Sequence, residues 1–131
     1  MRKKDNVVSG RGKYKIMDAN TIFCNKIRAT DIITSGNKIA LGTNSGEAMQ
    51  SFDAIAIGNG AGRYKQGVSA VAVGSNAGKY KQENNGIAIG SHSGETNQGT
   101  NSVAIGNNSG SSSQKQNSVA VGAYCGEINQ S

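Results

Sequence analysis

A short apolar segment that ends in glycine recurs six times in this chain, and its spacing constrains the fold more than any other feature. The segments start every sixteen residues, without an insertion or a deletion. They occupy residues 39–42, 55–58, 71–74, 87–90, 103–106 and 119–122. A fixed short period is the sequence signature of units that stack on one another as a solenoid. We therefore predict one domain whose repeated part is a stack of similar coils.

Each segment has the pattern of a buried β-strand. Side chains alternate between the two faces of a strand, so the first and third residues, which are Ile, Val or Leu, lie opposite the second, which is always Ala. Both faces are apolar, which is typical of strands that are covered on both sides. We predict an all-β fold, a parallel β-solenoid (β-roll) with sixteen residues per coil and about six coils. Each coil is expected to hold two short strands, the second at positions ten to fourteen of the repeat.

One face of the apolar strands needs a cover that the coil itself does not supply. The predicted second strand is mostly polar, as in residues 80–84, and it covers one face only. Identical chains packed around an axis would cover the other face. We expect the Ile and Val side chains to point into the chain's own coil and the Ala side chains to face the axis, although alternation alone leaves the reverse assignment open.

Glycine and glutamine occupy fixed positions of the repeat. Glycine adopts positive φ without a Cβ clash, so glycine at the fourth and eighth positions predicts a corner in every coil. Stacked coils lie about 4.8 Å apart, so we expect the side chains of the Gln at the twelfth position, and of the Asn at the fifteenth, to form amide ladders. The predicted structural residues are Gly42, Gly58, Gly74, Gly90, Gly106, Gly122, Gln50, Gln66, Gln82, Gln98, Gln114 and Gln130.

The two ends of the chain differ from the repeats. We predict a flexible basic arm at residues 1–15, an N-terminal cap or docking segment at 16–38 and the solenoid at 39–131. The arm could hold nucleic acid, an acidic partner or an anionic membrane face, or be a solvated tail. The last repeat stops without a polar cap, which indicates a contact end or a frayed coil. The basic residues of the arm are Arg2, Lys3, Lys4, Arg11, Lys13 and Lys15.

Composition limits both the core and the location. Hydrophobic residues make up 35% of the 131 residues and aromatic residues 5%, without Trp or Pro, so a core of large side chains is not expected. The net charge is +6, and nine of the fourteen Lys and Arg precede the first repeat. The basic start lacks the apolar run of a secretory signal, and no stretch is long enough to span a membrane. We therefore expect Cys24 and Cys125 to be reduced thiols of a protein made in a cytosol.

The sequence predicts no enzyme and no catalytic, metal or cofactor site. His92 occupies a corner position, and we interpret it as an exposed loop residue, because a catalytic histidine needs an orienting partner and a substrate pocket. The glycines of residues 58–62 resemble a phosphate-binding loop, but the repeat explains them and no helix pattern follows. Residues 57–61 also fit the hexapeptide unit of left-handed β-helix acyltransferases. Those enzymes need that unit three times in every eighteen-residue coil, whereas here it occurs once in every sixteen residues.

The repeats resemble a known family at residues 101–106, Asn-Ser-Val-Ala-Ile-Gly, and at residues 117–122, Asn-Ser-Val-Ala-Val-Gly. Both segments look like the motif of YadA-like heads in trimeric autotransporter adhesins, which are trimeric, left-handed parallel β-rolls. The resemblance covers residues 37–131. It departs from those heads in its longer period and in the lack of a signal peptide and a membrane anchor. The longer repeat is more similar to repeats in structural proteins of bacteriophages and large DNA viruses.

The resemblance implies a non-enzymatic structural protein of a virion, made in the host cytoplasm. It would be a homotrimeric fibre, spike or capsid-associated component that assembles through its apolar strands and its ends, with itself and with other virion or capsid proteins. The alternative is an adhesin or receptor-binding fibre head at a cell surface, which would use the exposed residues Tyr64, Lys65, Tyr80 and Lys81. Adjacent coils are expected to stack these residues into a basic aromatic stripe, or simply into a solvated outer sheet with favourable cross-strand pairs.

Overall fold

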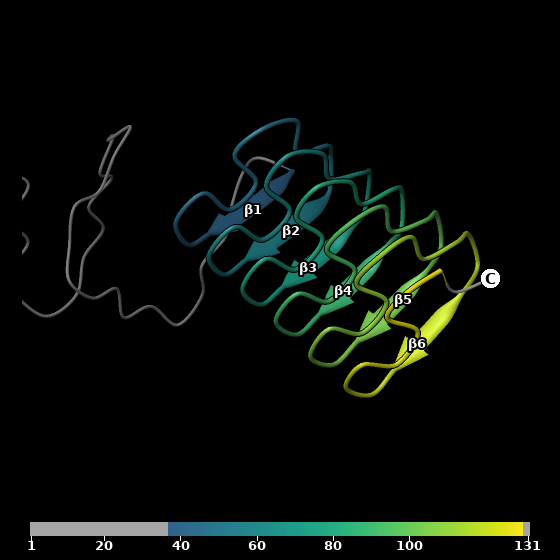
Figure 1. The fold of residues 1–131 in the computed structure, drawn as a ribbon. Helices are drawn as coiled ribbons and strands as arrows, with labels where there is room; N and C mark the ends of the chain where they lie inside the picture. The colour runs from purple at the N-terminus through teal and green to yellow at the C-terminus, as the bar shows by residue number, and fades with distance from the viewer. Residues whose placement is uncertain (1–36, 130–131) are drawn as a thin grey trace, which may run out of the picture. The chain divides into compact units, whose positions relative to one another are not determined.

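The computed structural model describes residues 37–129 of the chain. Within that range it contains six β-strands and no helix. The strands are β1 (Lys38–Leu41), β2 (Ala54–Ile57), β3 (Val71–Val73), β4 (Ile87–Ile89), β5 (Val103–Ile105) and β6 (Val119–Val121). Figure 1 shows them as arrows that follow one another in chain order, each displaced by one turn from the last.

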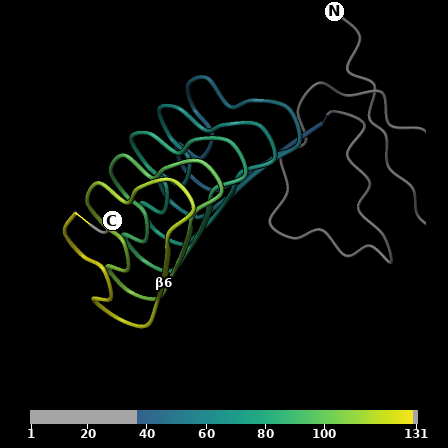
Figure 2. The ribbon, with the colours of Figure 1, turned by 90° about the vertical axis from the view of Figure 1, so that its right-hand side faces the viewer.

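The six strands form one parallel sheet in the order β1-β2-β3-β4-β5-β6. Each strand residue pairs with the residue sixteen positions further along, as Ile55 does with Val71 and Ala56 with Ala72. One turn of the chain therefore separates neighbouring strands, and Figure 2 shows the turns stacked behind one another. The predicted all-β, parallel β-solenoid is confirmed, with about five turns in place of about six.

The prediction of a second strand in each coil is wrong. Opposite the sheet the described chain forms isolated bridges between neighbouring turns, such as Gln66 with Gln82. In three of the turns a left-handed residue interrupts the extended backbone there, since Met49, Asn97 and Ser113 have φ of 53°, 54° and 57°. A strand needs negative φ, so these positions cannot continue one. Each apolar strand also ends before the glycine at the fourth position. The strands β3 to β6 therefore have three residues, whereas β1 and β2 keep four because they begin one residue before the predicted segment.

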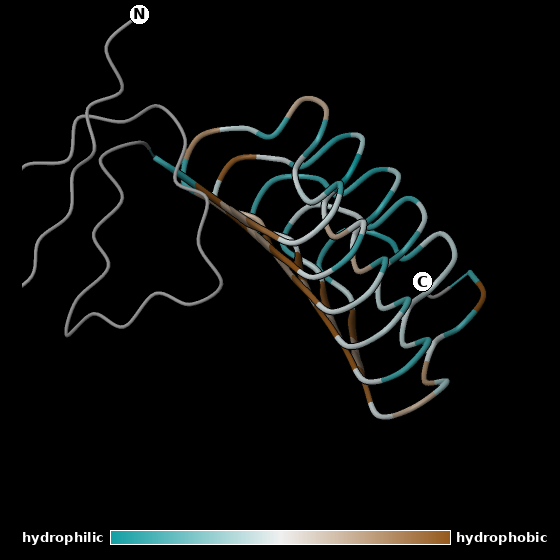
Figure 3. Ribbon diagram, turned by 90° about the vertical axis from the view of Figure 1, so that its left-hand side faces the viewer, coloured by the Kyte–Doolittle hydropathy of each residue, from teal (hydrophilic) through white to brown (hydrophobic). Residues whose placement is uncertain are grey.

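The strand side chains point in the direction opposite to our first expectation. Ala56, Ala72, Ala88, Ala104 and Ala120 are fully buried inside the solenoid. Their Ile and Val neighbours are half-buried or exposed on the outer face of the sheet. Figure 3 shows this face as a flat brown band along one wall of the solenoid. The sequence pattern had left this reverse assignment open, and the contents of the interior explain it.

Glutamine side chains fill the interior of the solenoid. Gln66, Gln82 and Gln98 are fully buried. The Gln82 Nε2 atom donates to the Val71 carbonyl at 2.8 Å and to the Gly86 carbonyl at 2.9 Å, both in its own turn, and the other two repeat the pattern. The predicted glutamine ladder is therefore wrong, because both amide hydrogens go to backbone carbonyls. Each glutamine reaches across the turn to the strand, which leaves room there for a methyl group only.

An asparagine ladder does form on the outside of the solenoid. The Asn85 Nδ2 atom donates to Asn101 Oδ1 at 3.1 Å, and Asn101 Nδ2 donates to Asn117 Oδ1 at 3.3 Å. All three residues are left-handed, with φ of 56°, 56° and 60°. Asn tolerates this backbone conformation better than other residues that carry a Cβ. The ladder predicted for the fifteenth position is confirmed in these three turns.

Asn101→Ala is expected to lower the free energy of unfolding by about 1–2 kcal/mol. The variant loses two exposed hydrogen bonds and places a residue without a local hydrogen bond at positive φ. Asn101→Gly keeps the backbone conformation, so its smaller loss isolates the contribution of the ladder. Asn59→Ala, at an exposed position of the same solenoid, serves as the control. Urea denaturation of the three variants measures these losses, and equal stability of Asn101→Ala and Asn59→Ala would contradict the ladder.

Candidate functional site

The outer face of the sheet is the first candidate surface, and we call it the apolar wall. Its side chains come from the first and third positions of all six strand segments: Ile39, Leu41, Ile55, Ile57, Val71, Val73, Ile87, Ile89, Val103, Ile105, Val119 and Val121. They stand in two columns, because each strand pairs with the next in register. Exposure is greatest at the ends of the stack, where Leu41 and Val121 each reach 59%. Contiguous apolar surfaces of this kind mark contacts with other molecules.

The second candidate surface is a cluster of cations and tyrosines, which we call the basic corner. It consists of two triplets in adjacent turns, Arg63, Tyr64 and Lys65 and then Lys79, Tyr80 and Lys81. The Tyr64 and Tyr80 rings stack with centroids 5.4 Å apart and planes 6° apart. The predicted stacking of the two tyrosines in adjacent coils is confirmed.

Two cations lie over the tyrosine rings. The Arg63 guanidinium carbon is 4.9 Å from the Tyr64 centroid, and the Lys79 Nζ atom is 4.9 Å from the Tyr80 centroid. Cation–π contacts of this length are attractive and hold a long side chain against the ring. The sequence had pointed to Tyr64, Lys65, Tyr80 and Lys81 only. The signal for the other two cations was available, because Arg and Lys stand at the same position of adjacent repeats.

Three carboxylates balance part of the charge of the basic corner. Glu47 accepts a hydrogen bond from Arg63 Nε, and Glu95 lies 4.0 Å from Lys79. Lys65 and Lys81 approach the same oxygen atom of Glu83, at 3.5 and 3.1 Å. The hydrogen bond from Lys81 and the nearby charge of Lys65 lower the pKa of Glu83, while the hydrogen bond to Glu47 raises the pKa of Arg63. The corner therefore keeps one positive charge in excess.

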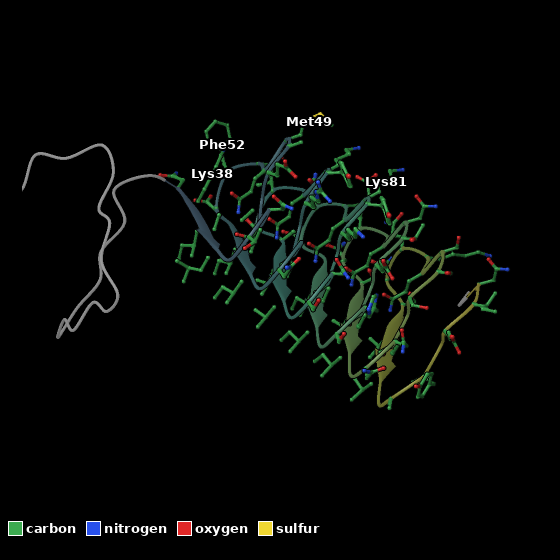
Figure 4. All side chains as sticks on the ribbon, turned by 60° about the vertical axis from the view of Figure 1, so that its left-hand side comes forward. Lys38, Met49, Phe52 and Lys81 are labelled. Carbon is green, nitrogen blue, oxygen red and sulfur yellow. The ribbon has the colours of Figure 1, made fainter. Side chains whose placement is uncertain are left out.

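The two candidate surfaces lie on opposite sides of the solenoid. Figure 4 shows Lys81 projecting from one side and the carbon-only side chains of the strands projecting from the other. This separation follows from the fold, because the strands form one wall and the ninth to eleventh positions of the repeat lie across the turn from it. A partner that covers the apolar wall would thus leave the basic corner open.

A smaller apolar group on the first two turns was missed by the sequence analysis. Met49, Phe52 and Val68 are exposed, and the Lys38 Nζ atom lies 5.8 Å from the Phe52 ring centroid. Figure 4 shows Phe52 next to Lys38, with Met49 further along the same side of the solenoid. The signal was a change of residue type along the stack, since later turns carry polar residues such as Asn84 at the position of Phe52.

Of the remaining residues that the sequence singled out, the structure describes His92 and Cys125. The His92 Nδ1 atom lies 2.8 Å from Glu95 Oε2, and the residue is half-buried instead of simply exposed. Cys125 is a free, exposed thiol. Among residues 37–129 there is no group of three or more His, Cys, Asp or Glu that could hold a metal ion, and no helix of that range could span a membrane. The basic arm (1–15), most of the predicted cap (16–38), Cys24 and Gln130 lie outside the described residues.

The glycines of the fourth position do belong to one structural arrangement. From Gly42 to Gly106 each one faces the backbone of the equivalent glycine in the next turn, closely enough that a Cβ atom would overlap it. The six glycines have φ between 119° and 128°, which confirms the predicted corner.

Comparisons with family models, with curated proteins and with solved structures give no match for this chain.

Proposed function

We propose that this chain is a non-enzymatic structural protein of a virion, a homotrimeric, left-handed β-solenoid with sixteen residues per coil. It serves as a fibre, spike or capsid-associated component. The observation that carries the proposal is the apolar wall, whose Ile, Val and Leu side chains lie outside the coil that bears them. Within residues 37–129 no second layer covers these side chains, which supports assembly with another molecule as the role of this surface.

Identical chains are the partners that fit the apolar wall best. The wall repeats at one spacing, so equivalent turns of neighbouring chains match along its whole length. Symmetric association of like surfaces around an axis is the usual arrangement of soluble oligomers. Burial of branched side chains contributes about 25 cal/mol for each Å² of apolar surface removed from water. In this arrangement the Ile and Val columns face the axis and the Ala columns remain inside each chain.

The virion location rests on the resemblance of the repeats to structural proteins of bacteriophages and large DNA viruses. A protein of that kind is made in the host cytoplasm and meets other virion or capsid proteins through the ends of the rod. The basic arm at residues 1–15 adds a possible contact with nucleic acid. Labelling purified virus particles with an antibody to the chain tests the location, and absence of the chain from the particles would contradict the proposal.

The mass of the protein in solution tests the assembly. We expect light scattering on a size-exclusion column to give about three times the 13.4 kDa of one chain. Ile89→Lys, which places a charge in the middle of the apolar wall, is expected to reduce that mass to one chain, because an ammonium group cannot be buried there without a partner. Tyr80→Lys, on the opposite side, is the matched control and should leave the mass unchanged.

Two results would contradict the assembly. One is a wild-type protein that stays a stable monomer at concentrations of about 100 μM, well above the Kd of an obligate oligomer. The other is a trimer that Ile89→Lys and Val73→Lys both leave intact while circular dichroism shows a folded solenoid. In either case the apolar wall would need another cover.

A further inference from the structure

The basic corner is a place where the outer surface of the solenoid departs from the residue types of the neighbouring turns. The repeated part of the chain contains five Lys and Arg, and four of them stand in the two triplets of the corner. The same three positions hold Glu-Ala-Met in the turn before the corner and Glu-Thr-Asn in the turn after it. The fold thus accepts varied residues at these positions. A cation-tyrosine-cation triplet in two adjacent turns is therefore not required by the solenoid.

Two lysines of the basic corner already bind a carboxylate of the protein itself. The Lys65 and Lys81 ammonium groups come from adjacent turns and converge on one oxygen atom, Glu83 Oε1. Each ammonium group has three hydrogens to donate, so both retain donors for a second anionic group. Their side chains stay 48% and 47% exposed, so a ligand can reach them from solvent. Glu83 is in effect a carboxylate that belongs to the protein and occupies one part of a wider anion site.

The two stacked tyrosines limit which chemical class of ligand can bind beside the lysines. Rings that stack 5.4 Å apart leave no room for a nucleobase between them, because two stacked carbon contacts need about 7 Å. A base stacked between Tyr64 and Tyr80, as in single-stranded nucleic acid sites, is thereby disfavoured. What remains open is a stack of exposed ring edges and phenolic hydroxyl groups, which combines apolar surface with donors and acceptors. Sugar rings present the same mixture of apolar carbon and hydroxyl groups.

We propose that the basic corner binds an acidic polysaccharide, with Lys65 and Lys81 holding a carboxylate or sulfate group and the edges of Tyr64 and Tyr80 contacting the sugar rings. Arg63 and Lys79 belong to the same two turns, where each lies over a tyrosine ring and pairs with Glu47 or Glu95. The proposal deepens the proposed function, in that a trimer built on the apolar wall would display three such corners on its outer side. Binding at a single corner does not itself need the trimer.

Surface plasmon resonance on the full immobilised chain tests this site. The probes are heparin, which is sulfated, hyaluronan, which is carboxylated, and dextran, which is neutral. We expect Lys65→Gln/Lys81→Gln to weaken binding of one or both acidic polysaccharides at least tenfold, since charge-assisted hydrogen bonds are lost. The matched control, Lys38→Gln/Lys115→Gln, removes the same charge elsewhere on the solenoid and should change the affinity less than twofold. Loss with heparin alone identifies sulfate as the recognised group, and loss with hyaluronan alone identifies carboxylate.

The basic arm is also a polycation, so each comparison is repeated with all six of its Lys and Arg replaced by glutamine. Binding to the acidic polysaccharides that disappears in this background, while the corner is intact, would overturn the proposal. Equal affinity of the corner for oligothymidine or polyglutamate would overturn it as well, because the corner would then be an unspecific charged surface. Light scattering on every variant keeps the two proposals apart, since a monomer that binds polysaccharide contradicts only the trimer and a trimer that does not bind contradicts only the site.

Discussion

Gly74→Ala is expected to lower the free energy of unfolding by about 3–5 kcal/mol. Gly74 has φ of 128°, a region that residues with a Cβ atom occupy only with strain. A Cβ at this position would lie 2.6 Å from the Gly90 carbonyl oxygen and 2.7 Å from its carbon. These are backbone atoms of the next turn, so relief requires the turns to separate. Separation stretches the parallel hydrogen bonds on both sides of the corner, among them the 2.8 Å bond from Gly90 N–H to the Val73 carbonyl.

Gly122→Ala is the matched control for this prediction. Gly122 stands at the same position of the last described turn, with φ of 119°, but its Cβ would meet nothing closer than the Cys125 Cβ at 3.9 Å. The control thus carries the backbone strain of about 1–3 kcal/mol without the overlap. Guanidinium denaturation followed by circular dichroism gives both values. If the two variants lose equal stability, the close approach of the turns is not what requires glycine at the fourth position.

Gln82→Glu is expected to destabilise the solenoid by about 4 kcal/mol at pH 7 and by much less at pH 4. The substitution exchanges one atom, yet it removes the Nε2 donor that serves the Val71 and Gly86 carbonyls. A carboxylate would face these two oxygens in a fully buried position. Burial raises the pKa of such a carboxyl, by up to 3–5 units for fully buried groups, and each unit corresponds to about 1.4 kcal/mol.

The sign of the pH dependence of stability follows from the pKa of the introduced carboxyl in the folded and unfolded states. With its pKa raised in the folded protein, the new carboxyl ionises at lower pH in the unfolded chain, so stability falls as the pH rises above about 4.3. Below that value both states are neutral, and the protonated acid can donate one hydrogen bond. The control is Gln116→Glu, at an exposed position of the outer surface. Urea denaturation at pH 4 and pH 7 measures both variants, and a pH-independent loss at position 82 would show that the side chain is not buried as described.

The same interior explains why glycine also recurs at the eighth position. A Cβ on Gly78 would lie 2.7 Å from Oε1 of Gln82, and one on Gly62 would lie 2.6 Å from Oε1 of Gln66. The glutamine cannot move aside, because its Nε2 atom is bound to two carbonyls. The Oε1 atoms of Gln66, Gln82 and Gln98 accept no hydrogen bond within the described residues. Each of these oxygens occupies the space that a Cβ at the eighth position would need, so the two positions depend on each other.

The pattern of residues along the chain was enough to predict the parallel stack, the sixteen-residue register, the small size of the core and the asparagine ladder. These features depend on local properties: the period, the Cβ-free glycines and the left-handed tolerance of residues such as Asn101 all act within one turn or between neighbouring turns. These features can therefore be predicted from one sequence, without knowing which side chains pack against the strand from the opposite side of the turn. The stacking of Tyr64 on Tyr80 belongs to the same class, because equal positions of adjacent repeats must lie side by side.

Which face of the strands is internal depends on contacts across the turn, and these could not be predicted from the residue pattern. Alternation places Ala72 opposite Val71 and Val73 but does not say which side is the inside. The deciding contact comes from Gln82, across the turn, whose amide reaches the Val71 carbonyl at 2.8 Å and occupies the space that a branched side chain would need. The same contact turned the expected glutamine ladder into bonds within each turn, and it left the Ile and Val columns on the outer surface as the apolar wall.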